Sequence, residues 1–80
     1  MTSLELGYKL RKMYEKKGAK KTTMIHLFGI IFAKEICDAA TTAAEIVKIA
    51  QIPESYHTEV SKGMNLSEYV ELKQQYKDTF

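Results

Sequence analysis

The sequence has a single cysteine, Cys37, among its 80 residues, and it therefore cannot form an internal disulfide. Cys37 follows Ile36 and stands near Ala39, and a free cysteine in apolar surroundings usually behaves as a small buried hydrophobe. We expect Cys37 to be buried. Because proteins without disulfides are typical of reducing compartments, we also expect the chain to be cytoplasmic.

Long apolar runs are also missing. The longest apolar string, Leu27–Ala33, is far shorter than the roughly 20 residues that cross a bilayer. The first charged residues of the chain are not followed by the apolar stretch that a signal peptide requires. We therefore expect no membrane partner and no targeting segment.

The residues of catalytic and metal sites are scarce. His26 and His57 are far apart in the sequence, no second cysteine or histidine has metal-ligand spacing, and no glycine-rich loop could hold a phosphate. Glu68 and Glu71 are three residues apart, as on a solvated helix face. The sequence predicts no catalytic residues, no metal and no cofactor, and thus a protein that is not an enzyme.

Strand signals are equally few. The β-branched run within Ile25–Phe32 has no partner strand and no hairpin turn elsewhere in the chain. Every periodic segment is bounded instead by a capping residue or a helix breaker. We predict an all-α fold, a small bundle of about five helices in one domain over residues 1–80. The expected helices span residues 3–17, 23–38, 43–50, 53–62 and 65–78.

Four residues are expected to mark helix boundaries. Ser3 would cap the first helix, and Gly18 would end it. Gly63 would end the fourth helix, and Asn65 would cap the fifth. Gly29 differs, because it lies inside the most apolar segment, where glycine costs about 1 kcal/mol relative to alanine. A closely crossing helix or a break in this helix, which Thr22 or Thr23 should cap, would explain it.

Basic residues are concentrated near the N-terminus. Seven of the twelve lysines and arginines precede Thr22, although the net charge is only +2. They could form a solvated helix face with cations near the C-terminal end of the helix dipole, or a patch that faces phosphates. In the second interpretation, Lys17, Lys20 and Lys21 are phosphate contacts.

The segment Thr41–Gly63 has the pattern of two short helices joined by a tight turn. Thr42 and Glu45 have the spacing of a capping box at the start of the first helix. Pro53 suits the first position of the second helix, because its φ is already helical and its missing amide proton would be unpaired there.

This segment resembles the helix-turn-helix superfamily of DNA-binding proteins. The positions that match the packing residues of the superfamily are Ile46, Ala50, Ile52 and Val60. Three positions depart from its pattern, where alanine, glycine and a buried aliphatic residue are usual: Val47, Gln51 and His57. A shift of one residue in the second helix would bury Tyr56 and turn His57 outward, which suits a ring with a polar hydroxyl. The longer string Thr23–Tyr69 also resembles a small helix-turn-helix-like module of bacterial restriction-endonuclease-type proteins.

The resemblance implies binding to duplex DNA, with the second motif helix in the major groove and the N-terminus of the first over a phosphate. The expected DNA-binding residues are Ser55, His57, Thr58, Ser61, Lys62, Lys17, Lys20, Lys21 and Thr42. Glu54 and Glu59 count against this interpretation, because carboxylates weaken the attraction to phosphates.

Two alternatives concern protein partners. The same helices could form a protein–protein interaction module, because a helical packing arrangement need not touch nucleic acid. The predicted C-terminal helix could also support a homodimer through Tyr76 and Phe80, or simply dock on the core. A role in regulation, or in a restriction or defence system with its nuclease on another polypeptide, is compatible with the DNA-binding interpretation.

Overall fold

Helices account for all the regular secondary structure of the computed structural model, which describes residues 1–80 and contains no strand. The elements are α1 (Ser3–Tyr14), α2 (Lys21–Asp38), α3 (Ala43–Ala50), the 3₁₀-helix η1 (Glu54–Tyr56), α4 (His57–Leu66) and the 3₁₀-helix η2 (Gln74–Tyr76). The all-α prediction is confirmed. None of these helices has the length and apolar character needed to span a bilayer.

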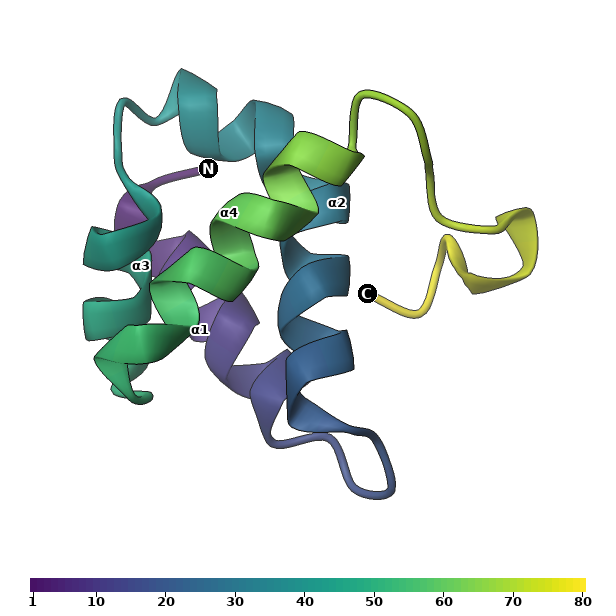
Figure 1. Ribbon diagram of the computed structural model, residues 1–80, viewed down its shortest axis with the longest axis horizontal. Helices are drawn as coiled ribbons and strands as arrows, with labels where there is room; N and C mark the ends of the chain where they lie inside the picture. The colour runs from purple at the N-terminus through teal and green to yellow at the C-terminus, as the bar shows by residue number, and fades with distance from the viewer.

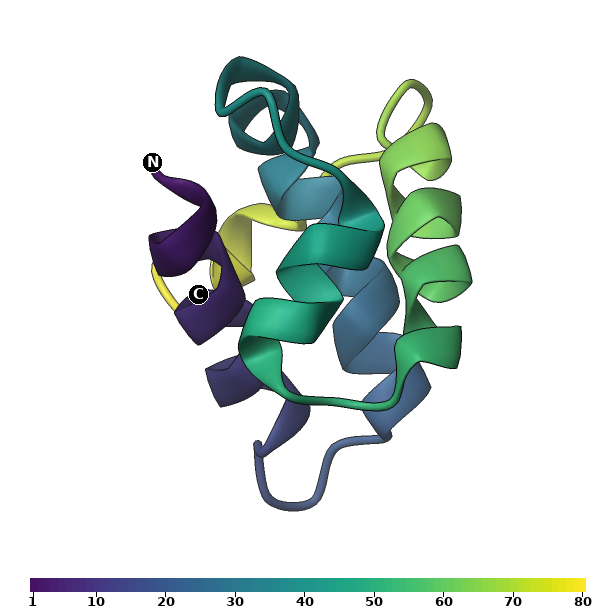
Figure 2. The same cartoon turned by 90° about the vertical axis from the view of Figure 1, so that its left-hand side faces the viewer.

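The four α-helices form a bundle in which direction alternates along the chain. Helices α1 and α3 run toward the end of the bundle that holds the α1–α2 loop and the α3–α4 turn, and α2 and α4 run away from it (Figures 1 and 2). Helices α1 and α4 lie on opposite sides of the molecule, with α2 and α3 between them (Figure 2). The α1–α2 loop, which spans residues 15–20 and contains three lysines, therefore shares one end of the bundle with the turn that joins the motif helices α3 and α4, here called the motif turn.

One apolar cluster holds the helices together. Its members come from all four α-helices and the motif turn, and the largest fully buried side chains are Phe28, Leu6, Leu10, Ile25, Ile36, Ile46, Val47 and Val60. The Phe28 and Phe32 rings lie 5.2 Å apart, centroid to centroid. Ile52 of the turn belongs to the same cluster, and Tyr56 packs against it. Both motif helices therefore contribute side chains to the same core as the central helix.

Two glycines let α2 and α4 approach closely. A Cβ atom on Gly63 would overlap the carbonyl oxygen of His26, and one on Gly29 would lie only 2.8 Å from the Met64 nitrogen. Both glycines are buried inside continuous helices. The close-crossing explanation for Gly29 is confirmed, and the prediction that Gly63 ends its helix is wrong. Gly63 is needed because a neighbouring backbone occupies the space of its side chain.

The ends of α1 and α2 differ from those expected. Thr2 caps α1 in place of Ser3, since its hydroxyl accepts from the Glu5 amide while the Glu5 carboxylate accepts from the Thr2 amide. Helix α1 ends at Tyr14, and Gly18 lies in the following loop with φ +78°. Helix α2 begins at Lys21 without any side-chain cap.

The predicted helix over residues 65–78 is wrong. Helix α4 continues to Leu66 and includes Asn65, and the amides of Tyr69 and Val70 both donate to the Leu66 carbonyl, which closes a turn. The segment beyond it returns to the bundle, where Phe80 packs against the core of its own chain. A C-terminal helix that could support a homodimer is therefore absent.

Cys37 is exposed, contrary to the expectation of a buried thiol. Its neighbour Ile36 ends the buried stripe of α2, and the next position lies about 100° around a helix of 3.6 residues per turn. The rotation turns the thiol toward solvent.

The close contact at Gly63 can be tested, because it predicts a change in stability of opposite sign to the change that helix propensity predicts. In an open helix, Gly63→Ala would stabilise by about 1 kcal/mol. Here the added methyl group meets the His26 carbonyl, and we expect a loss of about 1–3 kcal/mol, the usual range for overpacking. Thermal unfolding followed by circular dichroism measures the effect. A raised melting temperature would show that α2 and α4 are not in close contact.

Candidate nucleic-acid interface

Helix α3 begins as the sequence predicts. The Thr42 hydroxyl accepts from the Glu45 amide at 3.1 Å, but the Glu45 carboxylate accepts from the Thr41 hydroxyl, so the capping box is only half formed. At the other end, Gln51 adopts the left-handed conformation, with φ 58°. Gln51 thus takes the backbone conformation for which the superfamily usually has glycine.

Arg11 fastens this turn to the first helix. Its Nη1 donates to the carbonyl oxygens of Ala50 and Gln51, each at 3.1 Å, and its Nε lies 3.0 Å from a carboxylate oxygen of Glu15. The guanidinium therefore satisfies carbonyls that are otherwise unpaired at the end of α3. The sequence does not distinguish Arg11 from the other basic residues before Thr22, because its partners are about 40 residues away in the chain.

The start of the second motif helix is irregular. Pro53 precedes η1 and does not open α4, which begins at His57. Tyr56 packs on the core and meets Tyr14 edge to face, with ring centroids 5.6 Å apart, whereas His57 is exposed. The shifted phase of the second helix is therefore confirmed, and the predicted position of Pro53 at the first turn is wrong.

The outer face of α4 carries a polar stripe. Thr58, Lys62 and Asn65 are exposed at helical spacing, opposite the buried Val60 and Gly63. The Thr58 hydroxyl already donates to the Ser55 carbonyl at 2.9 Å. Asn65 was missed as a member of this stripe, because reading Gly63 as a helix end placed it outside the helix.

The other residues of this region that the sequence predicts to bind DNA differ in their exposure to solvent. Ser55 and His57 are exposed beside the turn, and Ser61 is half-buried at the side of the stripe. Ser55 and His57 also line a hollow of about 640 Å³ between α3 and α4, together with Ala44, Glu45, Lys48 and Glu54. The hollow mixes both signs of charge. Four of its six lining residues have ionisable side chains, and one of these, Glu54, is an exposed carboxylate.

Glu59 is held by two basic side chains. Its Oε1 lies 2.8 Å from the His26 Nε2, its Oε2 lies 3.1 Å from the Lys62 Nζ, and its side chain is 20% exposed. The hydrogen bond from Lys62, followed by the one from His26, holds the pKa of Glu59 below its ordinary value. The carboxylate is thus tied to two donors, and it opposes an approaching anion less than an isolated carboxylate would.

The lysines of the α1–α2 loop lie at the same end of the bundle as the start of α4 (Figures 1 and 2). The Lys21 Nζ donates to the Tyr14 carbonyl at 3.3 Å and lies 4.2 Å from the centroid of its ring, whose edge-to-face partner is Tyr56. Lys17 and Lys20 are exposed and form no ion pair. Thr42 lies at the far end of α3, so the fold does not bring it together with these lysines.

The hydrogen bonds of Glu59 predict how the stability of the protein changes with pH. Because the folded-state pKa of Glu59 is lowered, its contribution to stability is present above the ordinary carboxyl pKa and is lost as the pH falls through the folded value. We expect Glu59→Gln to lower the melting temperature at pH 7 and to flatten its decline in acid. Glu54→Gln, at an exposed carboxylate, is the control and should leave both nearly unchanged. If the two variants behave alike, the contacts of Glu59 are not formed in solution.

The chain was compared with known proteins. The model of a family described as an HTH-like domain matches residues 2–73, from the cap of α1 to just before η2. No curated protein and no solved structure matches the chain. The matched region contains all four α-helices and the motif turn, and the chain is a member of the HTH-like domain family.

Proposed function

We propose that the protein is a non-catalytic DNA-binding module that places the outer face of α4 in the major groove of a duplex. Family membership supports this, since a second motif helix in the major groove is how helix-turn-helix proteins read DNA. The observation that carries the proposal is the position of the lysine-rich loop beside the start of α4, through the contact of Tyr14 with Tyr56. Cations flanking a groove-reading helix are what phosphate contacts require.

The polar stripe of α4 suits base edges. Asn65 can bond adenine at two positions, and Lys62 can donate to guanine or to a phosphate. Thr58, Ser55, His57 and Ser61 supply further donors and acceptors around this stripe, although the Thr58 hydroxyl is already bonded to the backbone. In this proposal Lys17, Lys20 and Lys21 bind phosphates. The amides at the N-terminus of α3, beside Thr42, would reach a phosphate on a different part of the duplex.

The proposal extends to the biological setting. A module of this size that binds DNA without a catalytic centre fits a regulatory protein, or the recognition part of a bacterial restriction or defence system whose nuclease is a separate polypeptide. Both settings are in the cytoplasm, where bacterial DNA lies.

A second candidate is a protein–protein interaction module built on the same helices. One observation favours it: an apolar surface continues the outer face of α4, where Leu66 is 44%, Tyr69 83% and Val70 46% exposed. Exposed aromatic and aliphatic side chains that lie together often mark contacts with other proteins. Binding that requires Tyr69 but is insensitive to salt would favour this candidate over DNA.

Base readout is tested by removing two side chains of the stripe. We expect Lys62→Ala combined with Asn65→Ala to cost about 1–3 kcal/mol on a preferred sequence selected from a random duplex pool, and less on unselected DNA. Lys34→Ala combined with Gln75→Ala removes the same two kinds of group elsewhere and should leave both affinities unchanged. The measurement is a titration by fluorescence anisotropy at about 50 mM salt, where phosphate contacts are strong. No retention of any duplex would reject the proposal.

The phosphate contacts are tested separately. Lys17→Ala combined with Lys20→Ala should weaken binding to all sequences alike and reduce the log–log salt slope by about two, roughly one for each lost contact. These two lysines are preferred to Lys21, whose contacts with Tyr14 serve the fold. The control variant, Lys34→Ala combined with Lys77→Ala, has the same net charge as the Lys17 and Lys20 variant. An equal change in both variants would show a general charge effect and no local contact.

A further inference from the structure

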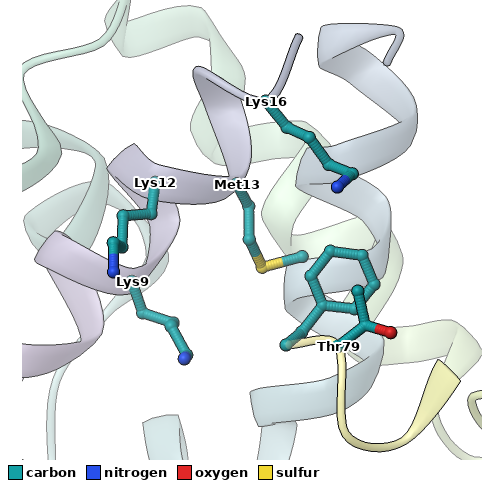
Figure 3. Close-up of a pocket in the computed structure, with 6 residues that line it drawn as sticks. Lys9, Lys12, Met13, Lys16 and Thr79 are labelled. Carbon is teal, nitrogen blue, oxygen red and sulfur yellow. The ribbon is translucent and has the colours of Figure 1, made fainter. Parts of the chain in front are cut away.

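Helix α1 presents a row of lysines on the side of the molecule away from α4. Lys9, Lys12 and Lys16 line one hollow of about 260 Å³, together with Met13 of the same helix and Thr79 and Phe80 of the returning C-terminal segment. Figure 3 shows the three lysines spread along α1 and its end, with Met13 pointing toward the segment that carries Thr79. The residues that line this hollow include no carboxylate side chain.

The carboxylates of α1 are engaged elsewhere. Glu5 accepts hydrogen bonds from Thr2, which hold its pKa below the ordinary value, and Glu15 pairs with Arg11. The three lysines of this face, Lys9, Lys12 and Lys16, therefore form no direct ion pair with a carboxylate side chain.

The C-terminal segment borders this face. Lys16 lies with its Nζ 5.9 Å from the centroid of the Phe80 ring, which packs on the core and holds the C-terminal segment against α1. Lys9 and Lys12 are one helical turn apart on α1, and Lys16 follows just beyond the end of the helix at Tyr14. Three cations around one hollow are complementary in charge to a phosphodiester backbone.

We propose that this lysine face of α1 binds the phosphate backbone of a second nucleic-acid segment. Helix α1, which carries Lys9 and Lys12, lies on the opposite side of the molecule from α4, with α2 and α3 between them (Figure 2). One chain would then hold two duplex segments at once. The proposal rests on the proposed function for the identity of the polyanion and goes beyond it in assigning a second surface.

The test is a bridging assay with the full chain and two short duplexes, one labelled with a donor fluorophore and the other with an acceptor. Energy transfer should rise when the wild-type protein is added at low salt. In Lys9→Ala combined with Lys12→Ala we expect a loss of at least about tenfold in bridging, with a salt slope lower by about two, while affinity for a single duplex through α4 is retained. Neither of these two lysines forms an ion pair, so the substitution should leave the melting temperature unchanged.

The control Lys34→Ala combined with Lys77→Ala has the same net charge and should bridge like the wild type. Bridging that persists in the Lys9 and Lys12 variant, as in a complex joined through a protein dimer, would overturn the second surface. Single-duplex binding by the wild type without any bridging would overturn it too, and would leave the proposed function standing. If the Lys62 and Asn65 variant binds normally while the Lys9 and Lys12 variant does not bind at all, the α1 face is supported and the α4 proposal fails.

Discussion

The close approach of α2 and α4 at Gly29 and Gly63 is the constraint on which the rest of the arrangement depends. Because neither glycine has a side chain, the two backbones come near enough to bury Val60 completely against the central helix. The same approach places Glu59 within hydrogen-bonding distance of His26. It also determines which side of α4 faces outward, and so which residues are available to a partner.

The motif turn depends on a second long-range contact. Arg11 donates to the last carbonyls of α3 and so supports a left-handed Gln51 without glycine. A charged donor is well suited to this position, since hydrogen bonds from ionised groups are stronger than those between neutral ones. The first helix is thus part of the motif's support and not merely a carrier of positive charge.

Basic side chains lie in two regions of the fold. The α1–α2 loop lies at the same end of the bundle as the start of α4 (Figure 2), whereas Lys9 and Lys12 line a hollow between α1 and the C-terminal segment. The two carboxylates of the second motif helix and its start also differ in their surroundings. Glu59 is bonded to two basic groups, whereas Glu54 is exposed to solvent. A net charge of +2 conveys none of this, since it sums over all charged groups wherever they lie in the fold.

Local patterns in the sequence determined the all-α class, the start of α3 at its Thr42 cap and the turn before Tyr56, because caps, breakers and apolar spacing act over three or four residues. Tertiary structure decided the roles of Gly63 and Asn65. A glycine that ends a helix and one that admits a neighbouring helix look alike in sequence, and the group that distinguishes them here, the His26 carbonyl, is far away in the chain. The continuation of α4 through Gly63 then placed Asn65 on its outer face and left the C-terminal segment to pack without a regular α-helix.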